Sequence, residues 1–364
     1  MKREVRVTLK DVAKLAGVSA VTVSNVLNNR PNVSEATRAR VQEAIQRTGY
    51  TVNLAARGLA GGRTNTVGML VPDLSTQYMG EIVRGASDEV RRSGMEMLIS
   101  TASDITRERN QVTFLQGITD GLLLLLPRTP DETLVVLEQA GVPVVVIDHR
   151  GSKIMLPSVD VDNYSGARLA VEHLLALGHR RIGLVSGPKG YGASSARLQG
   201  YKEALLAAGL PFDKTLVVPG DFLQPGGFSA GKKLLSLREP PTAIFAASDL
   251  MAFGVMEAIK ERGLRVPQDI SVIGFDDIPM ASQVYPPLTT IRQPLYQMGV
   301  AAARMMIAML RGVKPPLSRI TLPTELVERA STGRAAGAPP APTPHLLQRS
   351  RRLDKEKEVV DEPS

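Results

Sequence analysis

The 364-residue sequence contains no cysteine, which excludes a disulfide framework and a thiolate metal site. It also has no run approaching the ~20 apolar residues of a membrane-spanning helix. The basic start, MKREVRVTLKDVAKLAG, is not followed by an apolar run of signal-peptide length. Because a chain without disulfides also suits a reducing compartment, we expect a cytoplasmic protein.

Histidine is scarce, with four residues scattered along the chain. No Ser-His-Asp order or nucleophile elbow is visible. The carboxylate pairs Asp160 with Asp162 and Asp276 with Asp277 are joined by no histidine cluster, and adjacent residues of a strand point apart. The sequence therefore gives little support for catalysis, and we expect no enzyme activity, no metal and no cofactor.

The chain is long enough for more than one domain, and its charge is unevenly distributed along the sequence. Hydrophobic residues make up 43% and charged residues 22%, as in a globular protein large enough for a small module and a two-lobed body. Residues 1–63 hold eleven Lys and Arg against four acids, so +7 of the net charge of +8 lies there. A basic block beside a near-neutral body is typical of a polyanion-binding module, although a solvated basic tail is the alternative.

Residues 8–28 carry the signals of two short helices separated by a tight turn. Thr8 and Asp11 have the spacing of a capping box, Gly17 ends the first helix, and Ser19 is placed to cap the second. The apolar residues at helical spacing are expected to face inward: Leu9, Val12, Ala13, Ala16, Val23, Val26 and Leu27. The residues expected to point outward from the second helix are Ala20, Val21, Thr22, Asn25 and Asn28.

This order of helix, glycine-containing turn and helix is typical of the DNA-binding helix-turn-helix, whose second helix enters the major groove. A third helix begins at Ser34, and its Val41, Ala44 and Ile45 would close a three-helix core. We therefore expect residues 1–52 to form a DNA-binding headpiece.

Three segments of the sequence resemble the lactose-repressor (LacI) family of bacterial regulators: VTLKDVAKLAGVSAVTVSNVLN, VSEATRARVQEAIQRTGY and NLAARGLAG. The resemblance continues to about residue 332. It implies that Ala20, Val21 and Asn25 contact base edges. It places near the backbone phosphates Thr8, Ser19, Thr22, Ser24, Asn28 and Tyr50. Ala20 and Val21 have no hydrogen-bonding side chain and offer apolar contact only, for instance to a thymine methyl group. Any one of these residues could instead be an ordinary solvated position.

The segment from Asn53 to Ala60 has a helical composition but is shorter than the ~12–15 residues at which isolated helices become marginal in water. We expect it to be disordered away from DNA. The resemblance implies that two copies fold together over DNA as hinge helices, with Asn53 among the DNA contacts, Leu59 as an apolar wedge in the minor groove and Arg57 at its edge. A plain linker over residues 53–63 is the alternative.

From Thr66 onward, short apolar runs alternate with longer amphipathic stretches, which predicts a doubly wound α/β fold with parallel sheets. Seven apolar runs are predicted to form buried strands: TVGMLVP, MEMLIST, GLLLLLP, VPVVVID, RIGLVSG, TAIFAAS and ISVIGFD. The resemblance implies a periplasmic-binding-protein-like effector domain over residues 64–332. It assigns one lobe to about 64–162 plus 292–325, and the other to about 163–291.

Ligands of such sheets bind beyond the carboxyl ends of the strands, where several polar residues of this sequence fall. Carboxylates, an arginine and an aromatic ring suit a polyhydroxylated ligand, so a sugar or sugar derivative is the expected effector. By resemblance, the main contacts are Asp148, Arg197, Phe222 and Asp276. The supporting residues are Asp73, Tyr78, Ser248, Asp249 and Gln293. For Asp73 and Asp249, simple capping of the next helix is the alternative. The glycine-rich stretch at 187–192 lacks the spacing of a phosphate-binding loop and is expected to be an ordinary cleft loop.

Residues 333–364 turn to proline-rich and mixed-charge sequence that cannot bury a core, so we expect a disordered tail. The whole chain is predicted to be a transcriptional regulator, with repression the expected mode. It would bind operator DNA as a homodimer, or as paired dimers, under the control of a sugar-like effector. The alternatives are a sugar-binding receptor without a regulatory role and an enzyme with a vestigial headpiece.

Overall fold

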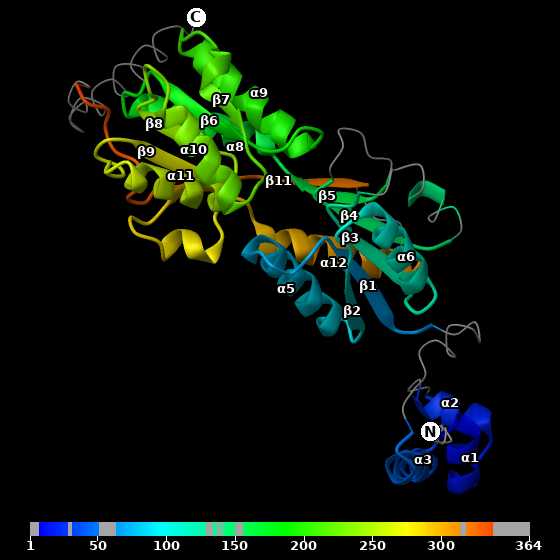
Figure 1. The fold of residues 1–364 in the computed structure, drawn as a ribbon. Helices are drawn as coiled ribbons and strands as arrows, with labels where there is room; N and C mark the ends of the chain where they lie inside the picture. The colour runs from blue at the N-terminus through cyan, green and yellow to red at the C-terminus, as the bar shows by residue number, and fades with distance from the viewer. Residues whose placement is uncertain are drawn as a thin grey trace, which may run out of the picture. The chain divides into compact units, whose positions relative to one another are not determined.

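The computed structural model describes residues 7–27, 31–50, 63–128, 134–136, 139, 141–149, 156–313 and 318–337. The chain divides into two compact units, a headpiece within Met1–Asn65 and a body that comprises most of the chain from Thr66 onward (Figure 1). None of the helices in these described ranges is long and apolar enough to cross a bilayer.

The headpiece consists of α1 (Leu9–Ala16), α2 (Ala20–Leu27) and α3 (Glu35–Thr48). The Asp11 carboxylate accepts hydrogen bonds from the backbone N–H and the hydroxyl of Thr8, at 2.8 and 2.7 Å, which fixes the start of α1. Gly17 ends α1 with φ of 63°, a left-handed conformation that favours glycine. Ser19 then accepts a hydrogen bond from Thr22 N at 3.1 Å and begins α2. The predicted helix, turn and second helix are thus confirmed.

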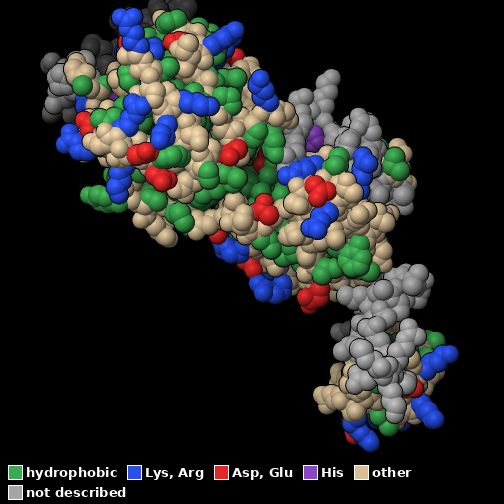
Figure 2. Space-filling view, in the orientation of Figure 1, with side chains coloured by type: hydrophobic (Ala, Val, Ile, Leu, Met, Phe, Trp, Pro, Cys, Tyr) green, Lys and Arg blue, Asp and Glu red, His purple; other side chains and the backbone are tan. Residues whose placement is uncertain are grey.

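The headpiece core is small and aliphatic. Its buried members are Val12, Ala13, Ala16, Val23, Val26, Val41 and Ala44. Three residues that the sequence predicts to be inward, Leu9, Leu27 and Ile45, are half-buried at its edge. The exposed face carries lysine and arginine side chains, some of which Figure 2 shows in blue.

The first lobe of the body is built on a six-stranded sheet in the order β11-β5-β4-β3-β1-β2. The strands are β1 (Thr66–Val71), β2 (Glu96–Thr101), β3 (Gly121–Leu125), β4 (Val144–Ile147), β5 (Ser158–Val161) and β11 (Arg319–Leu322). All neighbouring pairs are parallel. The buried clusters place α5 (Gln77–Arg92) and α12 (Leu295–Leu310) against one face and α6 (Ile105–Gln116) against the other.

The second lobe has a six-stranded sheet in the order β12-β10-β9-β8-β6-β7. Its strands are β6 (Ile182–Ser186), β7 (Val217–Pro219), β8 (Ala243–Ala246), β9 (Ser271–Asp276), β10 (Thr289–Arg292) and β12 (Glu325–Val327). The helices α8 (Asn163–Ala176) and α9 (Gly192–Ala207) cover one face, and α10 (Gln224–Leu235) and α11 (Asp249–Glu261) cover the other. The short 3-10 helices are η1 (Lys214–Leu216) and η2 (Pro279–Ser282). The doubly wound α/β fold with helices on both faces is therefore confirmed.

Within the residues that the structure describes, the chain crosses between the two sheets three times. The crossings follow β5, β10 and β11, so that each lobe is assembled from distant parts of the sequence. The expected return segment of the first lobe, 292–325, begins and ends inside the second sheet, because Arg292 belongs to β10 and Glu325 to β12. These two strands pair antiparallel, which departs from the parallel pairing predicted for the body.

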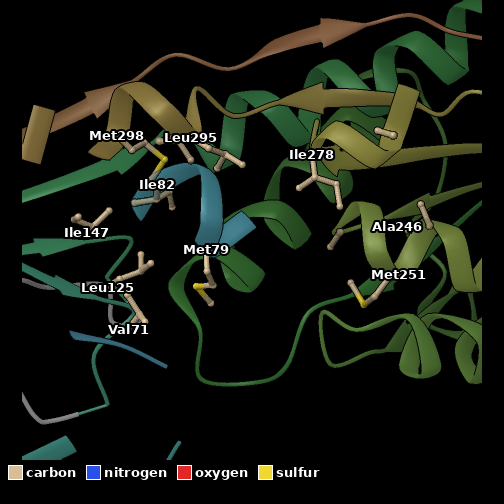
Figure 3. Close-up of a cluster of buried hydrophobic side chains, with 14 of the residues drawn as sticks. Val71, Met79, Ile82, Leu125, Ile147, Ala246, Met251, Ile278, Leu295 and Met298 are labelled. Carbon is tan, nitrogen blue, oxygen red and sulfur yellow. The ribbon is translucent and has the colours of Figure 1, made fainter. Parts of the chain in front are cut away.

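Close helix contacts hold the first lobe together. A Cβ added to Gly299 of α12 would lie 2.0 Å from Ile82 O, and one added to Gly85 of α5 would lie 2.0 Å from Tyr296 O. Only glycine allows backbones to approach so closely. The side chains of Ile82, Leu295 and Met298 fill the space beside this contact (Figure 3).

Two features of the strands differ from the sequence prediction. MEMLIST was expected to be a buried strand, but its β2 lies at the edge of the first sheet and is only half covered. The prediction is wrong because helices cover the central strands more completely than the edge. Strands β5, β7, β10, β11 and β12 were not predicted, since each has only three or four residues and lacks an apolar run as long as those that contain β4 and β8.

The expected boundary of the disordered tail at residue 333 is also wrong. His179 Nε2 donates a hydrogen bond to Gly333 O at 3.0 Å, Gly333 N donates to Ser271 Oγ at 3.0 Å, and Ala335 N donates to Leu177 O at 2.9 Å. The chain is therefore bound to the second lobe up to Ala335. Residues 338–364, the rest of the expected tail, lie outside the described residues.

We predict that His179→Ala lowers the free energy of unfolding by about 2–4 kcal/mol, because it removes the hydrogen bonds of the buried ring and leaves a cavity in its place. The ring also lies 2.9 Å from Thr242 Oγ1 and is 2% exposed. Urea denaturation followed by circular dichroism measures the change. His173→Ala is the control, because the only hydrogen bond described for the His173 side chain joins Nε2 to Thr332 Oγ1; an equal loss in both variants contradicts the prediction.

Candidate functional site

The exposed surface of α2 is the first candidate site. Val21 is 69% exposed, whereas Thr22, Ser24 and Asn25 are half-buried. Ala20 was expected to point outward, but it is half-buried and packs against the headpiece core. Val21 is therefore the apolar residue that α2 presents most fully.

The residues expected near phosphates have mixed surroundings. Thr8 and Ser19 are exposed and begin α1 and α2, where backbone N–H groups attract anions. Tyr50 is half-buried and packs against the headpiece core. Four other expected DNA contacts, Asn28, Asn53, Arg57 and Leu59, lie outside the described residues.

The second candidate site is a cavity of about 240 Å³ between the two lobes of the body. It lies where strands of both sheets end, since β1, β3, β4, β6, β7, β8 and β9 all lead into segments that line it. Seven of the nine expected effector contacts line the cavity: Asp73, Tyr78, Asp148, Arg197, Phe222, Ser248 and Asp276. The position beyond the carboxyl ends of the strands is the one that the sequence predicts.

Backbone strain is concentrated around this cavity. Among described non-glycine residues, six have positive φ, and four of these line the cavity: Leu126 (48°), Asp148 (51°), Phe222 (68°) and Asp276 (130°). Such conformations cost about 1–3 kcal/mol each and persist where the surrounding structure enforces them. The packing of both lobes therefore holds these side chains in fixed directions at the cavity.

The Arg197 guanidinium is the buried cation of the cavity. Its Nε donates to Asn163 Oδ1 at 2.8 Å, its Nη1 donates to Ala247 O, and Nη1 lies 3.9 Å from Asp276 Oδ1. The guanidinium also lies over the Phe275 ring at 3.7 Å from the centroid. At 4% exposure, Arg197 is held by groups from three different elements.

Two carboxylates face the cavity from opposite lobes. On the first lobe, the Tyr78 hydroxyl donates to Asp148 Oδ2 at 2.5 Å. On the second lobe, Gln293 Nε2 donates to Asp276 Oδ1 at 2.6 Å. Burial raises the pKa of Asp276 well above its usual value, the charge of Arg197 opposes this shift, and the nearby Asp249 adds to it. The cavity therefore offers hydrogen-bonding oxygens on both of its walls.

Gln293 and Asp249 do not line this cavity, and their expected contact with the effector stays a prediction. Gln293 lies behind Asp276 on the crossing between β10 and α12, and acts on the cavity only through that carboxylate. Asp249 is fully buried and accepts hydrogen bonds from Thr290 Oγ1 at 2.5 Å and Ile278 N at 2.9 Å. The N-cap of α11 is Ser248, whose Oγ accepts from Met251 N, so Asp249 anchors a loop rather than capping the helix.

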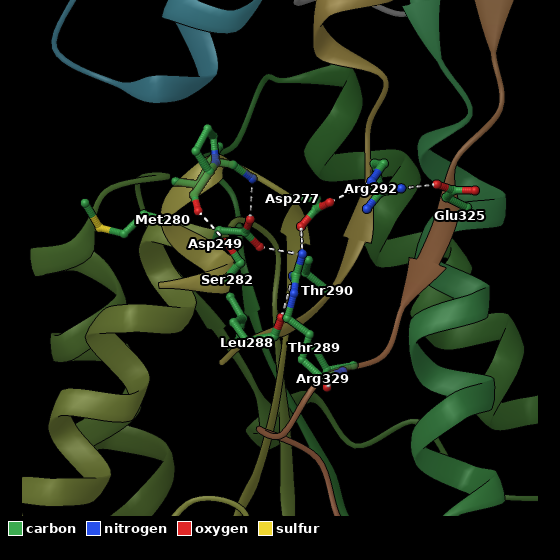
Figure 4. A network of polar contacts seen from close by, with 12 residues as sticks. Asp249, Asp277, Met280, Ser282, Leu288, Thr289, Thr290, Arg292, Glu325 and Arg329 are labelled. Carbon is green, nitrogen blue, oxygen red and sulfur yellow. Dashed lines mark hydrogen bonds and ion pairs between the residues drawn. The ribbon is translucent and has the colours of Figure 1, made fainter. Parts of the chain in front are cut away.

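A second carboxylate stabilises the same loop (Figure 4). Asp277 accepts hydrogen bonds from Arg292 Nε and Arg329 Nη2, both at 2.6 Å, and Arg292 Nη1 also donates to Glu325 at 2.6 Å. Asp276 and Asp277 thus point in different directions, one to the cavity and one to this network, as the sequence indicated. No group of acidic and histidine residues in the described ranges is arranged to hold a metal ion.

Sequence reasoning missed several cavity residues. Tyr191 meets Phe222 edge to face, with ring centroids 5.8 Å apart, and Asp221 precedes Phe222 at the mouth. Other lining residues that were not predicted are Thr76, Met79, Arg128, His149, Leu223, Leu250 and Ile278. Tyr191 lies in the glycine-rich stretch that was predicted to be a cleft loop. Its position in that stretch could have identified it as a cavity residue.

Asp73 shapes a turn and lines the cavity, but it does not cap the next helix, which was the alternative for this residue. Its Oδ1 accepts hydrogen bonds from Ser75 N at 2.8 Å and Ser75 Oγ at 2.6 Å, which shapes the turn before α5. It also lines the cavity. The N-cap of α5 is Thr76, which accepts from Met79 N, so Asp73 is not the helix cap.

A helix-turn-helix unit joined to a two-lobed body with a polar cavity between its lobes defines a ligand-responsive DNA-binding regulator. Comparison with known families supports this class of protein. Residues 8–53 match the family described as "Bacterial regulatory proteins, lacI family", and residues 171–332 match "Periplasmic binding protein-like domain".

Similar proteins cover nearly the whole chain. The HTH-type transcriptional regulator CelR of Thermobifida fusca is 39% identical over 342 residues, 91% of this chain and 100% of CelR. A solved CelR–cellobiose complex has a TM-score of 0.69 at 37% identity and covers 90% of this chain and 100% of that one. The lac repressor dimer bound to operator and the anti-inducer ONPF has a TM-score of 0.78 at 32% identity, with coverage of 90% and 99%.

This chain belongs to the lacI family of bacterial regulatory proteins, and it is a DNA-binding transcriptional regulator. The family resemblance and the functional class that the sequence predicts are therefore confirmed.

The carboxyl of Asp249 predicts a pH-dependent stability. Burial raises its pKa to about 7 from the ordinary 3.8. Because the folded protein then binds this proton more tightly than the unfolded chain, raising the pH from about 4 to about 7 lowers the contribution of Asp249 to stability. Relative to Asp249→Asn, which cannot ionise, the wild type should lose on the order of 2–4 kcal/mol across this window.

Urea denaturation of both proteins at pH 4.5 and 7.5 measures this difference. The comparison cancels the titration of groups remote from Asp249, and it includes the response of the neighbouring Asp276, whose pKa the charge of Asp249 raises. Free energies of unfolding that change in parallel with pH contradict the assignment.

Proposed function

We propose that this regulator is controlled by a sugar or sugar derivative bound in the interlobe cavity, and that it represses transcription as a homodimer in the cytoplasm. The observation that carries this proposal is the cavity itself, where carboxylates, a buried arginine and the ring of Phe222 converge from both lobes. Carboxylates accept hydrogen bonds from hydroxyl groups, arginine donates them, and an aromatic ring stacks on the C–H face of a sugar. The CelR complex with cellobiose supports this ligand class.

Exposed apolar side chains on the body support self-association. Tyr285 is 96% exposed, Phe114 and Leu74 are each 56% exposed, and Met280 is 40% exposed. Where such side chains form a contiguous patch, they commonly mark a protein interface. A symmetric pair would hold two headpieces for the two halves of a pseudo-palindromic operator, as in the lac repressor dimer bound to operator.

The proposed mechanism is a change in the angle between the lobes. A ligand that contacts Asp148 on one lobe and Asp276 on the other favours one interlobe angle. In a dimer, that angle sets the distance between the first lobes and hence between the segments at 53–63 that precede them. These segments would either fold together on the minor groove, with Leu59 as the wedge, or be drawn apart.

Two other functions share part of this structure. A sugar-binding receptor would need the body alone, and an enzyme would convert the ligand. The HTH-type relatives favour regulation over both. We propose that the ligand is bound and released unchanged; turnover of a bound ligand would favour the enzyme instead.

Val21→Asp tests the DNA-reading surface. We expect the full-length variant to lose at least tenfold in affinity for a duplex selected by the wild type from a random pool, because a carboxylate on α2 would meet the phosphates and the acceptor-rich groove. Fluorescence anisotropy measures the affinity.

Gln46→Asp is the matched control, since Gln46 is exposed on α3 and receives the same charge. It should bind within a fewfold of wild type. Equal loss in both variants would indicate a general charge effect, and no loss in Val21→Asp would remove α2 from the interface.

A further inference from the structure

The charges that surround the interlobe cavity are already balanced. In the part of the chain that the structure describes, its lining holds four carboxylates, Asp73, Asp148, Asp221 and Asp276, and two guanidiniums, Arg128 and Arg197. Four helices also begin at the cavity, because the N-caps of α5, α9, α10 and α11 all line it. Each helix N-terminus is equivalent to about half a positive charge, so the helix ends and guanidiniums together offset the carboxylates.

Both guanidiniums donate hydrogen bonds to protein groups. Arg197 is bound by Asn163, Ala247 and Asp276, as described above. Arg128 Nη1 donates to Ser103 O, and its backbone N–H donates to both oxygens of the buried Glu108 at 2.9 Å. Strong phosphate sites present the open edge of an arginine to two phosphate oxygens, whereas Nε and Nη1 of Arg197 and Nη1 of Arg128 already donate to protein oxygens.

The mouth of the cavity is acidic. Asp73 and Asp221 are both exposed, and each is fixed by a short turn, with Asp73 Oδ1 accepting from Ser75 N and Asp221 Oδ1 accepting from Leu223 N, both at 2.8 Å. A phosphate dianion entering between them would be repelled by two oriented carboxylates, whereas hydroxyl groups would donate hydrogen bonds to them.

From this balance we propose that the effector is an uncharged polyhydroxylated molecule, such as a free sugar or a nucleoside, and that the cavity rejects the phosphorylated form of the same molecule. This inference rests on the proposed function of the cavity as the effector site and narrows the class of ligand. The inner carboxylates, Asp148 and Asp276, bind hydroxyl groups. The outer carboxylates, Asp73 and Asp221, provide the selection against phosphate.

Matched ligand pairs test the proposal on the full-length protein. Thermal shift and then calorimetry are measured with ribose, glucose, galactose, cellobiose, adenosine and cytidine. The phosphorylated partners are ribose 5-phosphate, glucose 6-phosphate, galactose 6-phosphate, cellobiose 6-phosphate and the two nucleoside 5′-monophosphates. We expect at least one neutral member to bind, and its phosphorylated partner to bind at least tenfold more weakly. A phosphorylated member that binds as tightly as its parent, or a panel with no neutral ligand, overturns the proposal.

The double variant Asp73→Asn, Asp221→Asn tests the role of the mouth. Asparagine keeps the oxygen that accepts the turn hydrogen bond, so only the charge is removed. We expect the preference for the neutral ligand, which is the ratio of its affinity to that of its phosphorylated partner, to fall at least threefold.

Asp213→Asn is the matched control. Asp213 Oδ1 makes the same kind of turn with Thr215 N at 2.9 Å and Thr215 Oγ1 at 2.7 Å, but Asp213 does not line the cavity. The control should leave the preference unchanged. A double variant that matches the control overturns the assigned role of the outer carboxylates.

Operator binding by the same preparations separates this inference from the proposed function. If a phosphorylated ligand binds in the cavity and changes operator affinity, the proposed function stands and the inference fails. If neutral ligands bind without any effect on operator affinity, the inference stands and the regulatory role of the cavity fails.

Discussion

The buried guanidinium of Arg197 is the interaction on which the cavity depends. It joins the start of α8, through Asn163, to the end of β8, through Ala247, and to the end of β9, through Asp276. A buried charge that loses its partners costs several kcal/mol, so these three elements are constrained to remain together. Asn163 is also the first residue after the first crossing between the lobes. The same cation that shapes the cavity therefore fixes the point where the chain enters the second lobe.

The three crossings explain how a small ligand can act on a large structure. The loop that carries Asp276 is bound on one side to Gln293, on the crossing after β10, and on the other to Arg292 and Arg329 through Asp277. Arg292 in turn binds Glu325, the first residue after the third crossing. The Asp276 carboxylate thus lies next to two of the segments about which the lobes would rotate. Rigid lobes joined by such short segments move by hinge rotation.

Much of the fold and of the cavity could be predicted from the sequence. The strand-ending residues Asp73 and Asp148 lie together because parallel strands bring their carboxyl ends to one edge of a sheet, and Asp276 faces them from the carboxyl end of β9 in the second sheet. The sequence could not reveal that Asp249, one residue beyond Ser248, points into the core. That difference depends on Thr290 and Ile278, which come from another part of the chain. The short strands escaped prediction for a similar reason, since three or four residues such as those of β7 and β12 have too little pattern, and tertiary pairing decides their conformation.

The headpiece was the easier part to predict, because its signals are local. Gly17 ends a helix by its own conformation, and Ser19 and Ser34 cap the helices that follow them directly. By contrast, the charge balance of the cavity depends on four helix N-termini converging, and this can be seen only in three dimensions.

The account as a whole depends on the coupling between cavity and operator. The most direct test is to measure the affinity of the full-length protein for its operator with and without saturating ligand, and the affinity for that ligand with and without saturating operator. In a coupled regulator, the ligand must change the operator affinity by the same factor by which the operator changes the ligand affinity. This factor is typically between about 5-fold and 150-fold. Ligand binding that is unaffected by operator, with operator binding unaffected by ligand, would contradict the account.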